Sequence, residues 1–412
     1  MHPTMKIGIV PVAVTALAGG GFALFGGGAL PKAQPVAELP ANPVAGVQTQ
    51  KVQATGVPTP ETGWREEVLM KGFNVPWGMA FLPDGKLLVT ERAGQLYLVD
   101  LKANSKTEVP GLPPIPEIGQ GGLMDVALHP NFAKNRWVYF TAAQGNGSGN
   151  HSVLMRGTFD GAKISDAKIL FTPNFDKPGG QHFGSRIQFL KDGTLLMTLG
   201  DGGNPPNAMN GKLTRYYVQD MDSDLGKILR LDEKGNPPKD NPFAGQAGAQ
   251  PEIYTLGHRN VQGITMDPAT GRVFANEHGA FGGDEVNEIK KGHNYGWPKA
   301  TFSKEYSGAT ITDITSMPGM DDPLVAWTPC PAPSAIAFLS SGKYGDWKGD
   351  LFSAGLAGMD IRRIDLDSAG KVQGMTRLEI KDRVRNVIQG PDGFLYIAME
   401  GKNGRISRLM RD

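Results

Sequence analysis

The chain has 412 residues, of which 42 are Lys or Arg and 41 are Asp or Glu, so its formal net charge is +1. This balance excludes an overall basic surface, and we expect no nucleic-acid partner. A single cysteine, Cys330, excludes an intramolecular disulfide framework and a cysteine-rich metal site.

Residues 1–30 are expected to direct export. Lys6 precedes an uncharged, largely apolar run over 7–30, which is typical of a secretory signal peptide. The run is also about long enough to span a bilayer, so an uncleaved membrane anchor is the alternative. Both interpretations predict a periplasmic or extracellular protein. Residues 31–62, rich in Pro, Ala and Val, are predicted to form a flexible linker.

The rest of the chain, residues 63–412, repeats one pattern six times. Each copy has an apolar strand, a turn of the Asp-Gly type and a second apolar strand, which predicts a β-hairpin. The copies begin at Pro76, Leu123, Ser185, Val261, Ser334 and Val384. Their turn glycines, from Gly85 to Gly393, are about 60 residues apart, which suits a four-stranded propeller blade with a long loop.

We therefore predict an all-β fold, a six-bladed β-propeller, over residues 63–412. Segments such as "QLYLVD" and "DIRRIDL" are expected to form the outer strands of blades. The segment "WREEVLM", before the first copy, is expected to close the ring by pairing with the last blade. Two sandwich domains would also supply many short strands, but the constant phase of the hairpins favours the ring.

Polar residues recur where the first strand of a hairpin begins and where the second strand ends. In an antiparallel hairpin these two ends lie together, opposite the turn. Counted from the turns, the following residues fall at this end: Gln120, His182, Asp201, Arg259, Asn260, Gly279, Arg383 and Arg385. We expect them to face the axis at one end of the propeller, where loops on a rigid scaffold build a site.

The chemistry of this set points to a base and an anionic ligand. Asp201 flanks the same hairpin as His182, so its carboxylate can hold the imidazole tautomer and raise its basicity. Three arginines suit a ligand with several carboxylates, which guanidinium groups bind in a bidentate manner. Taken singly, each arginine or amide is better explained as a link between neighbouring blades, but the common phase of six residues favours a ligand.

The glycine-rich stretch 277–297, which contains four carboxylates, is a candidate calcium site. Carboxylate and backbone carbonyl oxygens are the ligands that calcium prefers. The stretch lacks the ligand spacing of an EF-hand, and a solvated acidic loop is the alternative.

Several longer motifs occur together between about residues 65 and 408. They are "GQGGLMDVALHPNF", "GGQHFGSRIQF", "LGDGG", "LGKILRL", "IYTLGHRNVQG", "NEHGAFGGDEVNEI", "GHNYGWP" and "RVRNVIQGPDG". In this combination the chain resembles the soluble quinoprotein sugar dehydrogenases, which depend on pyrroloquinoline quinone (PQQ). The resemblance implies a six-bladed propeller that oxidises the anomeric hydroxyl of an aldose to a lactone, or a sorbosone-type aldehyde to an acid. It also implies a small sugar substrate and an external electron acceptor.

The resemblance assigns a role to individual residues. His182 matches the general base of the family, and Asp201 matches the partner of that base. The residues around PQQ are matched by Gln120, Arg259, Asn260, Arg383 and Arg385. The backbone carbonyls of Gly279 and Ala280 match the ligands of a calcium ion beside the quinone. A second, structural calcium ion is matched by Glu285, the main chain of Tyr295, and Asp284.

Two positions depart from the family pattern. Ala280 stands where the family commonly has proline, which keeps a carbonyl ligand but loosens the loop. Ala357 stands where the family has a lysine expected to touch the quinone, which predicts weaker cofactor binding or an altered reactivity of the cofactor. Two alternatives therefore stay open: a calcium-dependent propeller hydrolase such as a lactonase, and a non-catalytic binding propeller that has lost the cofactor.

Overall fold

Six sheets of four or five strands form most of the structure, a computed structural model that describes residues 54–203 and 206–412. The first blade contains β4 (Pro76–Phe81), β5 (Leu87–Glu91), β6 (Leu96–Asp100) and β7 (Ser105–Glu108). The second contains β8 (Leu123–Leu128), β9 (Trp137–Gly145), β10 (Asn150–Phe159) and β11 (Ile164–Phe171). The third contains β12 (Ile187–Phe189), β13 (Leu195–Thr198), β16 (Ile228–Leu231) and β17 (Ile253–Thr255).

The remaining three blades follow in chain order. The fourth contains β18 (Val261–Met266), β19 (Val273–Glu277), β20 (Asp284–Ile289) and β21 (Val325–Trp327). The fifth contains β22 (Pro333–Phe338), β23 (Leu351–Gly355), β24 (Asp360–Leu366) and β25 (Val372–Glu379). The sixth contains β26 (Val384–Gln389), β27 (Leu395–Met399), β28 (Gly404–Arg411) and β3 (Trp64–Phe73).

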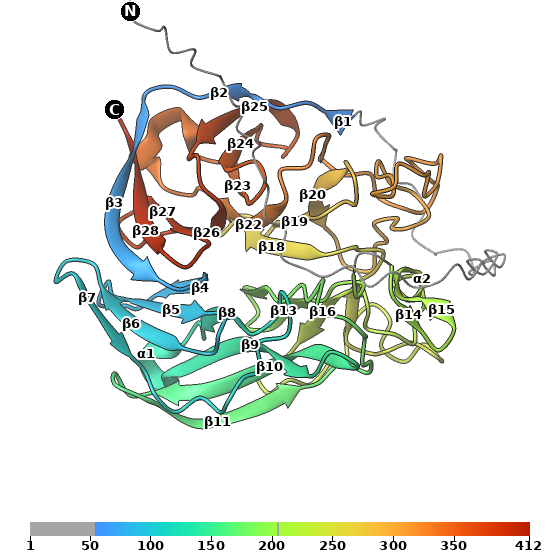
Figure 1. The fold of residues 1–412 in the computed structure, drawn as a ribbon, viewed down its shortest axis with the longest axis horizontal. Helices are drawn as coiled ribbons and strands as arrows, with labels where there is room; N and C mark the ends of the chain where they lie inside the picture. The colour runs from blue at the N-terminus through green and yellow to red at the C-terminus, as the bar shows by residue number, and fades with distance from the viewer. Residues whose placement is uncertain (1–53, 204–205) are drawn as a thin grey trace, which may run out of the picture. The chain divides into compact units, whose positions relative to one another are not determined.

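The sheets are arranged as a closed ring, which confirms the predicted six-bladed propeller (Figure 1). The innermost strands contact one another in the order β4, β8, β12, β18, β22 and β26, and β26 contacts β4 again. Each of the six predicted hairpins forms the two inner strands of one blade. The predicted closure is also confirmed, because β3 pairs antiparallel with β28 in the last blade, with Trp64 opposite Arg411.

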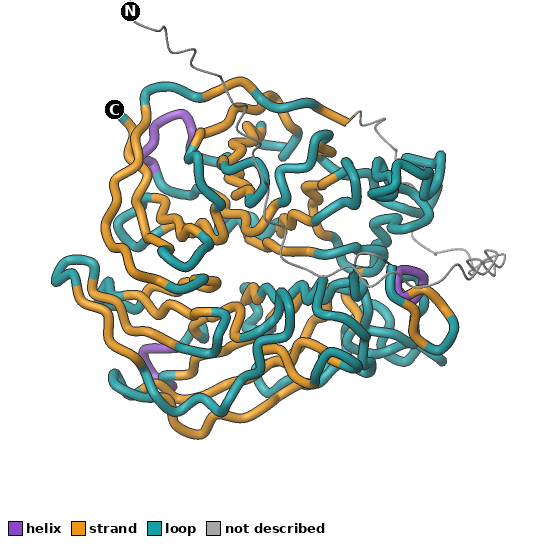
Figure 2. Tube along the Cα trace, viewed as in Figure 1, coloured by secondary structure: helices purple, strands orange, loops and turns teal. Residues whose placement is uncertain are grey.

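The turns explain why the sequence repeat folds into hairpins. In the third blade, Gly193 adopts a φ of 84°, which glycine tolerates without steric cost. The preceding Asp192 accepts a hydrogen bond from the backbone N–H of Thr194 at 2.9 Å and so stabilises the turn. Two of the turns are longer than an Asp-Gly turn, and each contains a short helix. The turn between β8 and β9 contains α1 (Phe132–Asn135), and the turn between β22 and β23 contains the 3-10 helix η1 (Gly342–Trp347) (Figure 2).

The hydrophobic core is divided among the interfaces between blades. Six apolar clusters each join one pair of neighbouring blades, so that every blade packs on both of its neighbours. In one of them, for example, Leu88 of β5 packs with Val126 of β8, and both are buried. Because burial of a side chain of this size contributes about 1.5–3 kcal/mol, these clusters hold the ring together.

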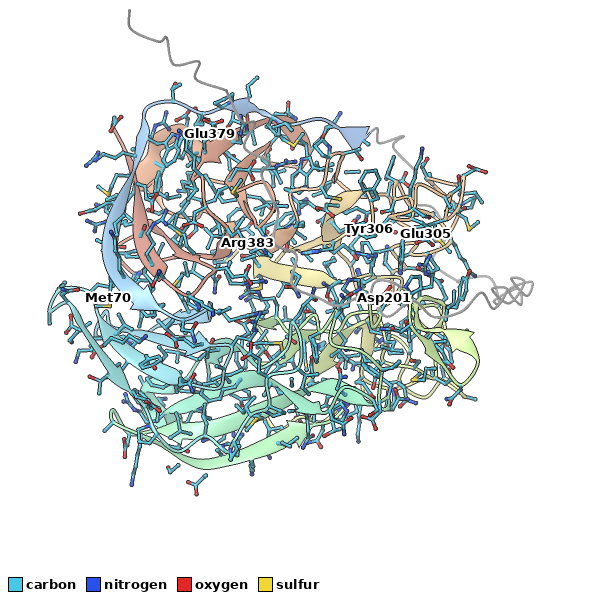
Figure 3. All side chains as sticks on the ribbon, viewed as in Figure 1. Met70, Asp201, Glu305, Tyr306, Glu379 and Arg383 are labelled. Atoms are coloured by element: carbon cyan, nitrogen blue, oxygen red, sulfur yellow. The ribbon has the colours of Figure 1, made fainter. Side chains whose placement is uncertain are left out.

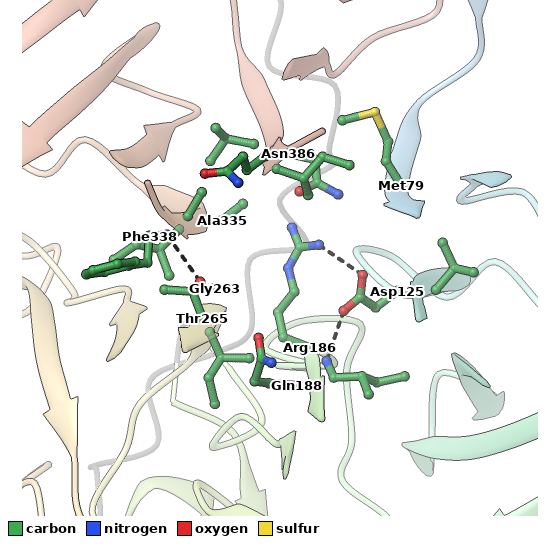
Figure 4. Close-up of a pocket in the computed structure, with 17 residues that line it drawn as sticks. Met79, Asp125, Arg186, Gln188, Gly263, Thr265, Ala335, Phe338 and Asn386 are labelled. Atoms are coloured by element: carbon green, nitrogen blue, oxygen red, sulfur yellow. Dashed lines mark hydrogen bonds and ion pairs between the residues drawn. The ribbon is translucent and has the colours of Figure 1, made fainter. Parts of the chain in front are cut away.

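One arginine at the centre of the ring contacts all five of the other blades. The guanidinium group belongs to Arg186, at the start of the third blade. It donates to three backbone carbonyls, those of Gln262 (2.7 Å), Ser334 (2.6 Å) and Arg385 (3.1 Å). It also donates to Asp125 Oδ1 at 3.1 Å, and its Cζ lies 4.1 Å from the centre of the Trp77 ring. Figure 4 shows Arg186 and Asp125 joined at the centre of the ring. Arg186 therefore ties the inner ends of the blades together.

The segment before the propeller domain is partly described. Residues 54–62, expected to belong to the linker, run along two blades, where β1 (Ala54–Thr55) and β2 (Thr59–Pro60) pair in parallel with β21 and β25. The export segment 1–30 and the linker up to residue 53 lie outside the described residues, so both stay predictions. Within residues 54–203 and 206–412, no helix has the length and hydrophobicity needed to cross a membrane.

Candidate active site

His182 and Asp201 form a buried pair at the predicted end of the third blade. His182 Nδ1 lies 2.6 Å from Asp201 Oδ1, and the two side chains are 6% and 1% exposed. Burial by itself raises the pKa of Asp201, but its contacts with His182 and the charge of Arg259 outweigh burial and hold the pKa below its usual range. The ionised carboxylate accepts the Nδ1 proton, so Nε2 carries the free lone pair.

The carboxylate of Asp201 is anchored from two further sides. Its Oδ2 accepts the indole N–H of Trp297 at 3.0 Å, and its Oδ1 accepts the backbone N–H of Gly203 at 3.1 Å. A carboxylate fixed by three donors cannot rotate away from the imidazole. The orientation of His182 is therefore set before any ligand arrives.

The backbone of His182 is held in a left-handed conformation. Its φ is 51°, which is uncommon for a residue with a side chain and persists only where neighbours impose it. Gln120 Oε1 accepts the backbone N–H of His182 at 3.1 Å, and Asn260 Oδ1 accepts that of Gly184 at 3.1 Å. The two amides predicted to lie near the site thus hold both sides of the histidine loop.

Two of the predicted arginines meet on a carboxylate that the sequence analysis missed. Glu400, directly after β27, accepts Arg383 Nε at 2.9 Å and Arg385 Nη2 at 2.7 Å. Burial tends to raise the pKa of Glu400, but the two guanidinium groups lower it to about 2. Half of the Arg383 side chain is exposed, whereas Arg385 is buried and its Nε has no hydrogen-bond partner among the described residues.

The third arginine, Arg259, belongs to the same site but binds backbone oxygens. Its Nη1 donates to the carbonyl of His278 at 3.2 Å and to that of Gly279, and its guanidinium lies 5.3 Å from the Trp297 ring. Within the part of the chain that the structure describes, it forms no ion pair with a carboxylate. The three guanidinium groups of the site therefore lie near the carboxylates of Asp201, Glu400 and Asp284. Figure 3 marks Asp201 and Arg383 on different blades.

His278 lies near both His182 and the arginines Arg259 and Arg385. Burial, followed by the charges of His182, Arg259 and Arg385, lowers the pKa of His278 to about 3, so its ring stays neutral. Its Nε2 lies 2.7 Å from the carbonyl of Pro333 and donates to it, because a carbonyl can only accept. His278 therefore lines the site, and its Nε2 proton is donated to a backbone carbonyl.

Ala357 lies at the same end of the propeller, as its phase in the fifth blade predicts. It follows β23, its side chain is exposed, and the carbonyl of the preceding Leu356 accepts Arg383 Nη1 at 3.5 Å. The position where a lysine is expected from the resemblance is thus beside Arg383, and this chain supplies no charge there.

The residues expected to bind calcium fall into two groups. Gly279 O accepts Arg259, and Ala280 O lies 3.7 Å from the sulfur of Cys330. Asp284 holds the loop: its carboxylate oxygens accept the backbone N–H groups of Gly279 and Ala332, each at 2.7 Å. A calcium ion at Gly279 O would require Arg259 to give up its hydrogen bond, and the calcium roles of these residues stay predictions.

The second group contains two adjacent carboxyl groups, of which Glu277 is buried and Glu285 half-buried. Glu277 of β19 lies opposite Glu285 of β20, and Asn287 Nδ2 donates to both, at 3.3 and 3.2 Å. Burial and the neighbouring charge of Glu277 raise the pKa of Glu285 well above its usual range. A small cavity next to this pair is lined also by Tyr295, Gly279 and Thr301. Among the described residues, no three His, Cys, Asp or Glu side chains converge as a metal-binding group.

Comparison with known proteins identifies the family. The family model of the glucose/sorbosone dehydrogenases matches residues 73–408. The chain belongs to the glucose/sorbosone dehydrogenase family. Membership in this family makes it an oxidoreductase with the fold of the PQQ-type sugar dehydrogenases, and the resemblance predicted from the motifs is confirmed.

Individual members of the family match over most of their length. The aldose sugar dehydrogenase YliI of Escherichia coli is 35% identical over 350 residues, which cover 83% of this chain and 92% of that protein. An uncharacterised protein of Synechocystis is 42% identical over 398 residues, 94% of this chain and 96% of that one. The PQQ-bound aldose sugar dehydrogenase of Streptomyces coelicolor superposes with a TM-score of 0.69 at 30% identity, covering 86% of this chain and all of that chain.

Three residues of the site escaped the sequence analysis. Glu400 was detectable, because it follows the turn glycine Gly393 by nearly the same interval as Asp201 follows Gly193. Trp297 lies within the quoted motif "GHNYGWP", but no local pattern predicts that its indole reaches Asp201. Lys177 precedes the histidine motif in a stretch without periodicity, and only the structure reveals its burial.

Proposed function

We propose that this protein is an exported, PQQ- and calcium-dependent dehydrogenase that oxidises the anomeric hydroxyl of an aldose to a lactone. The observation that carries the proposal is the buried His182–Asp201 pair beside three arginines, at one end of a propeller of the sugar dehydrogenase family. The pair supplies a neutral base, and the arginines supply a place for an anionic cofactor.

The unused donors of the arginines support PQQ, which has three carboxylates. Arg259 donates to backbone carbonyls and forms no ion pair among the described residues, and Asp201 is already committed to His182 and Trp297. The buried Arg385 Nε, which has no hydrogen-bond partner in the described part of the chain, is a donor that a carboxylate ligand would satisfy. Arg259, Arg383 and Arg385 would hold the cofactor, and the name of the Streptomyces relative, a PQQ-bound enzyme, agrees with this assignment.

The protein's own residues are proposed to have the following roles in the reaction. His182 Nε2 accepts the proton of the sugar hydroxyl, while Asp201 holds Nδ1–H and stabilises the imidazolium that forms. Gln120 and Asn260 keep the histidine loop in place. PQQ, when bound, supplies the two-electron acceptor that oxidation of an alcohol requires. An external electron acceptor would be required to reoxidise it between turnovers.

The test of this function is a cofactor titration of the chain lacking residues 1–40. With PQQ and calcium we expect saturable reduction of a dye by one or more aldoses. Arg383→Gln is expected to weaken PQQ affinity about tenfold or more, because a charge-assisted hydrogen bond contributes about 1.5–3 kcal/mol. Arg383 is preferred to Arg385 because Glu400 then keeps one partner.

Arg377→Gln is the matched control, since Arg377 lies on the outer strand β25 and pairs with Glu379. Its PQQ affinity should equal that of the unmodified chain. Folded protein that neither binds PQQ nor turns over a sugar would contradict the proposal. Hydrolysis of sugar lactones without quinone would then favour the lactonase, and sugar binding without turnover the binding propeller.

Calcium is expected to stabilise the protein through the adjacent carboxyl groups of Glu277 and Glu285. Repulsion from Glu277 contributes to the raised pKa of Glu285, and a divalent cation between the two would allow both to ionise. At one hundred times its Kd, calcium should stabilise the chain by about 2.7 kcal/mol, measured by thermal unfolding with and without chelator. Glu285→Gln should reduce this gain, whereas Glu379→Gln, an exposed carboxylate on β25, should not. If calcium does not change the melting temperature of the unmodified chain, of Glu285→Gln or of Glu379→Gln, the proposed calcium site is refuted.

Export is proposed from the N-terminal segment. An apolar run over 7–30 behind Lys6 supports secretion, with or without a membrane anchor. Determination of the mature N-terminus after expression with the full leader distinguishes cleavage from anchoring. Recovery of the full-length chain in the cytoplasm would contradict export.

A further inference from the structure

A second charged group, Lys177, is buried against the catalytic pair. Lys177 lies between β11 and the histidine loop and is 1% exposed. Its backbone is fixed by two hydrogen bonds to the backbone of Asn150, both at 3.0 Å. Its Nζ donates to Asn150 Oδ1 at 2.7 Å, which is its one hydrogen-bond acceptor among the described residues. A buried ammonium with so few partners is costly, so its position requires an explanation.

The side chain of Lys177 lies between the two segments that carry the pair. Its Nζ is 3.9 Å from the ring centroid of Phe183, the residue after His182. Its Cδ lies 3.2 Å from where a Cβ on Gly202, the residue after Asp201, would be placed. The lysine side chain thus packs against the residues that directly follow both members of the His182–Asp201 pair. Glycine at position 202 leaves the space for the lysine stem.

The electrostatic neighbours of this lysine are the members of the pair. Burial lowers the pKa of Lys177 to about 7, and the charge of Asp201 opposes this effect. His182 is faced by Asp201, Arg259, Lys177 and His278. Burial first, then Arg259 and Lys177, lowers the pKa of His182, while Asp201 raises it. In the acid range where His182 accepts its proton, Lys177 is therefore charged.

We propose that Lys177 is a positioning residue for the dehydrogenase reaction, whose buried ammonium beside the pair keeps His182 neutral. This inference rests on the proposed role of His182 as the base. An ionised Asp201 holds the Nδ1–H tautomer, but it also favours the imidazolium, which cannot accept a proton. The ammonium counters the second effect without weakening the first. His182 then keeps a free lone pair on Nε2 under mildly acid conditions.

The first test compares Lys177→Met and Lys177→Arg with the unmodified protein. Methionine keeps the apolar stem and removes the charge, so the acid limb of kcat/KM is expected to move to higher pH by about one unit. Arginine keeps the charge and should leave the limb in place. Lys227→Met is the matched control, because Lys227 is equally buried but donates to the carbonyls of Tyr217, Val218 and Leu225. It should lose stability without a shift of the limb.

The second test needs no turnover and therefore separates this inference from the proposed function. NMR titration of the apo protein measures the pKa of the His182 ring directly, and Lys177→Met should raise it by about the same amount. An unchanged His182 pKa would overturn the inference even if the enzyme is active. If the uncharged variant Lys177→Met does not fold, the Lys177 ammonium is instead titrated by NMR in the unmodified protein. A lysine that is already neutral while His182 titrates would overturn the inference as well.

Discussion

His182→Ala is expected to reduce kcat with an aldose by about 10²–10⁴-fold, while the affinity for PQQ changes little. The reason is that general base catalysis contributes a factor of this size, and the imidazole is the group whose Nε2 is free to accept a proton. Asp201→Asn should cause a loss of the same order, because an amide can stabilise the wrong tautomer and carries no charge. Steady-state kinetics with reconstituted protein provide the measurement.

The control is His151→Ala, since His151 pairs with Asp176 outside the site. Its kcat should match that of the unmodified enzyme. Full turnover by His182→Ala would refute the assignment of the base.

The pH profile should show the same base. Burial and the charge of Arg259 lower the pKa of His182 below its ordinary value of 6.5. Since the base acts in its neutral form, activity rises with pH through this pKa, and the acid limb of kcat/KM should lie below 6.5. An acid limb above that value would show that the imidazole is less shielded than its burial indicates.

Arg186→Met is expected to destabilise the propeller by about 3–5 kcal/mol. The change leaves Asp125 buried without its charged partner and removes hydrogen bonds to the carbonyls of three blades. Burial already raises the pKa of Asp125, and Arg186 and backbone N–H groups oppose that effect. The free energy of unfolding from urea titration provides the measurement.

Two further variants test the cause of this loss. Arg186→Met combined with Asp125→Leu should recover part of the stability, because no unpaired charge is then buried. Arg408→Met, which breaks a surface ion pair with Glu67, should cost about 0–1 kcal/mol. If Arg186→Met costs no more than Arg408→Met, the axial arginine does not tie the blades together.

The sequence by itself determined the propeller and the end of the ring where the site lies. A hairpin depends on neighbours in the chain, namely alternating apolar residues and a turn such as Asp192–Gly193. Once the hairpins are counted, their common phase places His182, Asp201 and the arginines at one end without any knowledge of long-range contacts. The pairing of β3 with the last blade followed in the same way, because an unpaired strand remained before the first repeat.

The tertiary structure alone decided the partners of these groups. Trp297 reaches Asp201 across 96 residues, and Arg186 reaches Arg385 across 199. Such contacts depend on the curvature of the ring, which brings loops of different blades to one axis. The burial of Lys177 and the meeting of Arg383 and Arg385 on Glu400 are of the same kind. The sequence pattern shows which residue types lie at the end of each blade. Which charged group each of these residues contacts is decided by the packing between blades.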